Sequence, residues 1–71
     1  MKATINYQKI EGFFGQKLEN GNRWLFVKGQ SGRSYSVAMV NANNEIVKYD
    51  SQPAIRAGSN EEIAAALLAA A

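Results

Sequence analysis

The segment best suited to binding chemistry is Gly29–Ser34, with the sequence GQSGRS, which follows Lys28 and contains Arg33. Cations beside glycines are typical of loops that hold phosphate. A P-loop, however, needs a strand before it, a helix after it and a Gly-Lys-Ser/Thr ending. This segment ends Gly-Arg-Ser and leads into an alternating apolar stretch. We therefore predict a hairpin turn, with Lys28 and Arg33 flanking its tip at near-equivalent positions on paired strands.

Aromatic residues interleaved with cations offer a second kind of chemistry. Rings on an open sheet face stack bases, while lysine and arginine hold phosphates. The residues predicted to bind nucleic acid or another anion are Lys28, Arg33, Arg23, Lys48, Trp24 and Tyr35. The alternative is that the seven aromatic residues (three Phe, three Tyr and one Trp) pack in the core and the eight cations are solvated surface.

The sequence contains few of the residue types that carry out catalysis or bind metal ions. The chain has no His and no Cys, which removes the usual general base, thiolate ligands and disulfides. The carboxylates do not form an acid/base pair: Glu61 and Glu62 would diverge by about 100° on a helix. Glu45 and Asp50 would lie on opposite faces of one strand. We therefore expect no enzyme, no cofactor and no metal site.

Length and charge set further expectations. The chain of 71 residues predicts one small domain over residues 1–71. Domains of this size often need additional stabilisation, and because the chain has no cysteine for a disulfide, we expect self-association to be the remaining source. A net charge of +2 favours solubility more than it indicates a partner. The first residues lack a secretory signal, and no stretch reaches the roughly 18 apolar residues of a membrane span. A cytoplasmic location without membrane contact is expected.

The last segment has the clearest local signal, a helix over about residues 59–70 after a connector over residues 51–58. Ser59 and Glu62 have the spacing of a capping box, and an alanine-rich stretch follows them. The residues expected on one apolar face are Ile63, Ala66, Leu67 and Ala70. The helix is expected to cover its own sheet; the alternative is an oligomerisation helix that acts through Ile63, Leu67 and Leu68.

Upstream, between about residues 2 and 50, short apolar runs predict strands. These runs are Ala3–Gln8, a strand around Phe14–Leu18, Trp24–Val27, Ser34–Val40 with Tyr35, Val37 and Met39 on one face, and Glu45–Tyr49. Turns are expected at Asn20-Gly21 and at Asn41–Asn44. Residues 9–19 also fit a helical stripe, but Gly12 and Gly15 favour a strand with a bend or bulge.

The combined pattern predicts an α+β fold, an antiparallel β-meander of four to five strands followed by one C-terminal helix packed on one sheet face. The alternative is a small five-stranded barrel with an appended helix. The expected function is a non-enzymatic binding module that takes single-stranded or phosphate-backbone nucleic acid through a basic hairpin and an exposed aromatic sheet face. The alternative is a homo-oligomerising interaction module or a small inhibitor or adaptor protein. A third possibility is a dimer that holds an anionic ligand between its subunits through Arg33 or Arg56.

Overall fold

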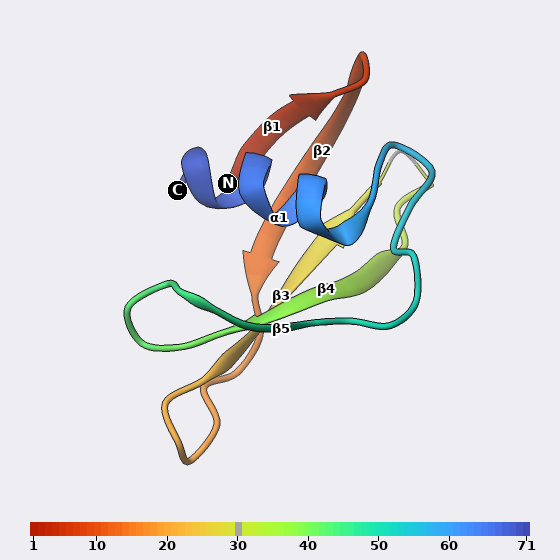
Figure 1. Ribbon diagram of the computed structural model, residues 1–71. Helices are drawn as coiled ribbons and strands as arrows, with labels where there is room; N and C mark the ends of the chain where they lie inside the picture. The colour runs from red at the N-terminus through yellow and green to blue at the C-terminus, as the bar shows by residue number, and fades with distance from the viewer. Residues whose placement is uncertain (30) are drawn as a thin grey trace.

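The sheet is an open antiparallel meander. The computed structural model describes residues 1–29 and 31–71, and in these it contains β1 (Lys2–Ile5), β2 (Gln8–Phe14), β3 (Arg23–Lys28), β4 (Ser34–Val40), β5 (Ile46–Tyr49) and α1 (Asn60–Ala69). The strands pair in the order β1-β2-β3-β4-β5, and α1 packs on one face against β1 and β4 (Figure 1). The α+β meander is confirmed. The barrel alternative is wrong, because the sheet is not closed.

The start of α1 is fixed by the predicted capping box. The Ser59 hydroxyl accepts a hydrogen bond from the Glu62 backbone N–H, and the Glu62 carboxylate accepts one from the Ser59 backbone N–H, both at 3.1 Å. These bonds satisfy donors that the first helical turn would otherwise leave free.

Among the residues that the structure describes, no helix has both the length and the apolar composition that a membrane span requires.

The buried stripe of α1 begins one turn earlier than predicted, at a polar residue. Its members are Asn60, Ile63, Ala64 and Leu67, whereas Ala66 is only half-buried and Ala70 is exposed, so the predicted face was partly wrong. Asn60 tolerates burial because its side chain is saturated with hydrogen bonds. It accepts from the Ala54 N–H at 3.1 Å and donates to the carbonyls of Asp50 and Gln52.

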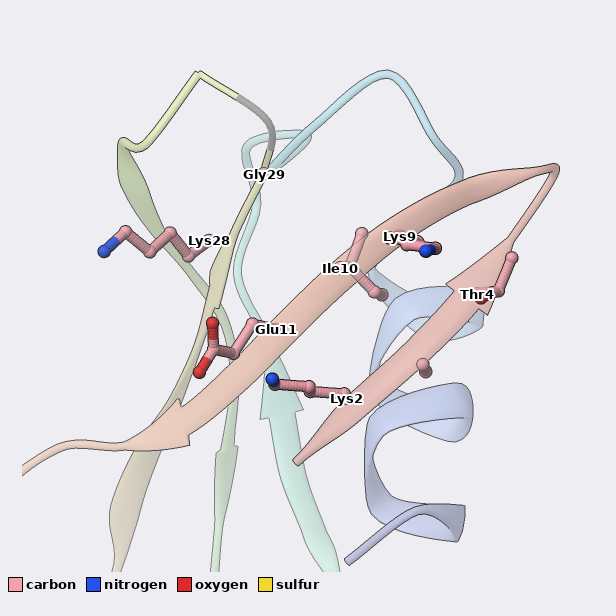
Figure 2. A pocket seen from close by; sticks show the side chains of 8 residues that line it. Lys2, Thr4, Lys9, Ile10, Glu11, Lys28 and Gly29 are labelled. Carbon is pink, nitrogen blue, oxygen red and sulfur yellow. The ribbon is translucent and has the colours of Figure 1, made fainter.

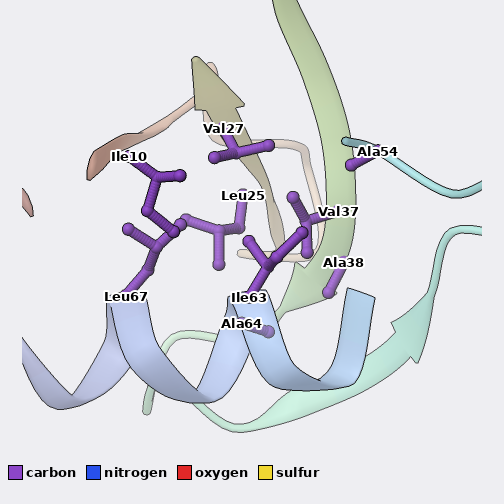
Figure 3. Close-up of a cluster of buried hydrophobic side chains, with 9 residues drawn as sticks. All are labelled: Ile10, Leu25, Val27, Val37, Ala38, Ala54, Ile63, Ala64 and Leu67. Atoms are coloured by element: carbon purple, nitrogen blue, oxygen red, sulfur yellow. The ribbon is translucent and has the colours of Figure 1, made fainter. Parts of the chain in front are cut away.

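The core lies between α1 and the sheet face beneath it. Figure 3 shows Ile63 and Leu67 of α1 directed toward Leu25 and Val27 of the central strand β3, and all four side chains are fully buried. Gly12 of β2 allows this close packing, since a Cβ atom there would lie 2.7 Å from Leu67 Cδ1. The helix and the sheet therefore share one aliphatic core.

A β-bulge changes which residues of β4 share a face. The register between β3 and β4 shifts between Leu25 and Phe26, so that Val37 and Ala38 are both fully buried. Tyr35 pairs with Val27 on the helix side, while Met39 pairs with Trp24 on the other side. The prediction that Tyr35, Val37 and Met39 share one face is wrong, because strict alternation does not hold across a bulge.

The N-terminal hairpin also departs from the prediction. The expected strand Ala3–Gln8 is interrupted by a two-residue turn at Asn6 and Tyr7, both with positive φ (47° and 64°). The turn escaped prediction because it contains no glycine.

The second strand therefore ends earlier than predicted. β2 stops at Phe14, and residues 15–22 form a loop instead of the strand expected around Phe14–Leu18. The Asn20-Gly21 turn within this loop is confirmed, with Gly21 at φ 85° and its N–H donating to the Leu18 carbonyl at 3.0 Å. A helical stripe over residues 9–19 is excluded, since their first half is strand.

Candidate functional site

The face of the sheet opposite α1 carries aromatic rings at its centre. Because Leu25 and Val27 point toward α1, the alternate residues of β3, Trp24 and Phe26, point to the opposite face. Both rings are only half-buried. No element in the described ranges covers this side, so we call it the open face.

Neighbouring strands extend these two rings into a cluster. The Phe13 ring stacks on Phe26 with their centroids 5.4 Å apart and their planes 16° from parallel. Met39 lies beside Trp24, and Lys48 places its ammonium nitrogen 5.7 Å from the centre of the Trp24 ring. We call these five residues the open-face cluster. Phe13 is 42% exposed, so part of this residue is accessible to a ligand.

Charged residues continue the open face toward β1. The register places Glu11 of β2 between Lys2 of β1 and Lys28 of β3, and it places Lys9 opposite Thr4. Together with backbone and neighbouring atoms they line a surface groove of about 630 Å³ (Figure 2). We call this the lysine groove. Its wall carries three cations and one carboxylate.

The electrostatics of the lysine groove favour an anion. Opposite charges facing each other across strands stabilise a sheet by about 0.2–1 kcal/mol per pair, which accounts for Glu11 between its two lysines. One carboxylate cannot neutralise three ammonium groups, so a net positive charge remains. All four side chains are exposed, and the attraction for an anion will therefore be screened by salt.

A second carboxylate borders the open face near the aromatic rings. The Ser36 hydroxyl, on the strand position paired with Phe26, donates a hydrogen bond to Asp50. This bond, followed by one from the Gln52 backbone N–H, lowers the pKa of Asp50 below its ordinary value of 3.8. Asp50 is therefore ionised at neutral pH.

The structure brings together three of the six predicted ligand-binding residues. Trp24 and Lys48 belong to the open-face cluster, and Lys28 lines the lysine groove on the same face. The other three, Arg23, Tyr35 and Arg33, lie elsewhere.

Arg23 and Tyr35 point to the helix side of the sheet. The Arg23 guanidinium lies over the Phe14 ring at 4.1 Å and donates to the Asn44 side chain at 3.2 Å. Tyr35 lines a neighbouring hollow of about 420 Å³ together with Arg56, and this hollow shares Lys9, Ile10 and Gly29 with the lysine groove. The structure therefore does not bring Arg23 or Tyr35 together with Trp24 on one face.

Arg33 lies in the turn before β4. Lys28 pairs with Ser34, so Arg33 lies one residue before the position paired with Lys28, in the turn and not on the strand itself. The hairpin turn is supported by the Gly32 N–H, which donates to the Gly29 carbonyl at 3.1 Å, and by φ 83° at Gly32. Gln30, within the predicted loop, lies outside the described residues.

Sequence reasoning did not assign Lys2, Glu11, Phe13 and Met39 to the ligand-binding face. A period of two over residues 8–14 separates Lys9, Glu11 and Phe13 from the helix-facing positions, and this signal was present in the sequence. It was obscured because Gly12 leaves the buried face without a side chain and because Phe13 and Phe14 are adjacent.

The predicted oligomerisation residues lie against the chain's own sheet. Ile63 and Leu67 are fully buried there, and Leu68 is half-buried at the margin of the core. A second copy would find little of this helix face accessible. An oligomerisation role for these residues stays a prediction.

Comparison of the chain with family models, with curated proteins and with solved structures finds no match. A functional inference therefore depends on the chemistry of the open face.

Proposed function

We propose that this chain binds single-stranded nucleic acid on its open face. The observation that carries the proposal is the trio of exposed Phe13 and partly buried Trp24 and Phe26 at the centre of a sheet face that α1 leaves uncovered. Stacking on such rings is worth about 1–3 kcal/mol per base and tolerates any sequence, because every base has a π-face.

The lysine groove supplies the complementary contacts. Lys28 stands between the aromatic rings and the groove, since it follows Phe26 on the open face of β3. Phosphates lying along Lys28, Lys2 and Lys9 would release counterions, so that affinity falls as salt rises. Bases on the rings and phosphates on the lysines together predict a binder with little sequence preference.

Self-association is the second candidate, favoured by the exposed edge of the sheet at β5. Val47 and Tyr49 are 50% and 40% exposed there. An edge strand with unpaired backbone groups can pair with another chain. A dimer mass in light scattering that is lost on replacing Val47 with Lys would support this function.

The nucleic-acid proposal is tested by fluorescence titration. Trp24 is the only tryptophan, so quenching on addition of single-stranded DNA or RNA reports a base on the open-face cluster. Binding should weaken steeply between low and near-physiological salt. Lys28→Gln should weaken binding and reduce the salt slope by about 0.7, the value for one phosphate contact on a single strand.

Two further variants sharpen the test. Glu11→Gln removes the one carboxylate of the lysine groove and should tighten binding, an outcome that general damage to the fold would not produce. Arg56→Gln removes a cation that does not line the lysine groove and is the matched control, with affinity unchanged. Absence of quenching at low salt, or equal losses for Lys28→Gln and Arg56→Gln, would contradict the proposal.

A further inference from the structure

The turn between β1 and β2 holds an aromatic residue in a backbone conformation that aromatic residues disfavour. Asn6 and Tyr7 have φ 47° and 64°, the pattern of a two-residue turn with both central residues left-handed. Asparagine tolerates this region, and glycine is the usual second residue. A tyrosine with φ 64° is strained, and such strain persists where the surrounding structure enforces it.

Contacts within the chain do not explain the tyrosine. Its side chain is fully exposed (102%), so it contributes nothing to the core. The turn itself is held in place, because the Asn6 side chain donates a hydrogen bond to the Ala57 carbonyl in the connector before α1. A fixed turn thus presents an exposed ring at a conformational cost that folding alone does not require.

The position of this turn connects it with the open face. Thr4 and Lys9, which are paired across β1 and β2, both line the lysine groove. Only the next cross-strand pair, Ile5 and Gln8, lies between them and the turn. Along β2, Phe13 and Tyr7 are six residues apart, or about 20 Å at the rise of an extended strand. A ligand that follows β2 from the open-face cluster would cross the lysine groove and reach Tyr7.

We propose that Tyr7 is a stacking residue for a base at the far end of a bound single strand. This inference rests on the proposed function. The ligand would place bases on the open-face cluster and phosphates along the lysine groove, and a further base would meet the Tyr7 ring. The strained turn then serves to project the ring beyond the sheet.

The test compares Tyr7→Gly with the wild-type chain on two lengths of single-stranded DNA. An oligonucleotide of about ten nucleotides should lose roughly tenfold in affinity, as expected for one lost stacking contact, whereas one of about four nucleotides, near the lower limit of such sites, should lose none. The same variant should unfold at a higher temperature, because glycine relieves the strained φ. Stability and affinity thus move in opposite directions.

Two variants serve as controls. Tyr7→Phe keeps the ring and should bind both lengths as the wild type does. Tyr49→Ala removes a ring that is 40% exposed on the strand position paired with buried Ala38, and it should leave the affinity for both lengths unchanged.

The two proposals fail in different ways. If the wild type binds neither oligonucleotide, the proposed function falls, and the role of Tyr7 falls with it. If the wild type binds and Tyr7→Gly binds the longer strand equally well, only the role of Tyr7 is overturned. A lower unfolding temperature for Tyr7→Gly would overturn the strain on which that role depends.

Discussion

The centres of the two faces of this sheet are built from different residue types. The centre of the covered face is aliphatic, with Leu25, Val27 and Val37 fully buried beneath α1, although Arg23 and Tyr35 also point to that side. The open face is aromatic and cationic, and its rings are either partly buried, as in Trp24 and Phe26, or exposed, as in Phe13. Aliphatic side chains stabilise the fold in proportion to the apolar area that they remove from water, whereas a partly exposed aromatic ring also offers a surface on which another flat group can stack. This difference is the basis for the proposal that the open face, and not the covered face, binds a ligand.

Truncation on the covered face should have the largest effect. Leu67→Ala removes buried volume next to Gly12 and should lower the free energy of unfolding by about 2–5 kcal/mol. A domain of this size has roughly 3–5 kcal/mol of stability, so much of the protein would unfold. Urea denaturation measures the loss. A change below about 1 kcal/mol, the range of mild core substitutions, would mean that α1 adds little to the core.

Truncation on the open face should affect affinity more than stability. Phe13→Ala removes the more exposed ring of the stacked pair and should weaken single-strand binding by about tenfold, within the 1–3 kcal/mol of one stacking contact. Trp24 fluorescence reports binding and urea denaturation reports stability. If stability falls as far as in Leu67→Ala while the affinity of the folded fraction is unchanged, the open face is a second core and not a binding surface.

The smallest expected effect is a pH dependence at the border of the open face. Hydrogen bonds from Ser36 and then Gln52 lower the pKa of Asp50 in the folded state. Its contribution to stability is therefore fully present above the unfolded value near 3.8 and is lost as the pH falls through the lower folded value. Asp50→Asn should be less stable than the wild type at neutral pH, and the gap should close in acid. Thermal unfolding across this range measures it, and a gap that widens in acid would contradict the assignment.

Local signals predicted the parts of the fold that depend on neighbouring residues. The capping box of Ser59 and Glu62 and the bounds of β4 follow from sequence, since side-chain chemistry within a few residues determines them. The burial of Asn60 could not be predicted, because its hydrogen-bond partners lie six to ten residues away in a connector without regular structure. The Asn6-Tyr7 turn was missed because it lacks its usual glycine.

The candidate site was predictable in part. Trp24, Lys28 and Lys48 reach one face as strand periodicity requires. Arg23 could have been excluded from the sequence alone, since adjacent residues of a strand point to opposite faces and Arg23 precedes Trp24. Tyr35 could not, because the bulge at Val37 that changes its side depends on the pairing of two strands.

The saturated side chain of Asn60 has a consequence for how the covered face opens. Its amide joins the first turn of α1 to the backbone of Asp50, Gln52 and Ala54. The helix cannot detach without breaking these three bonds, and the connector cannot loosen without leaving a buried amide unpaired. Helix and connector thus form one cooperative unit, in which partial detachment is suppressed. The aliphatic face is then exposed only in rare, larger openings, which limits the time that a small domain spends prone to aggregation.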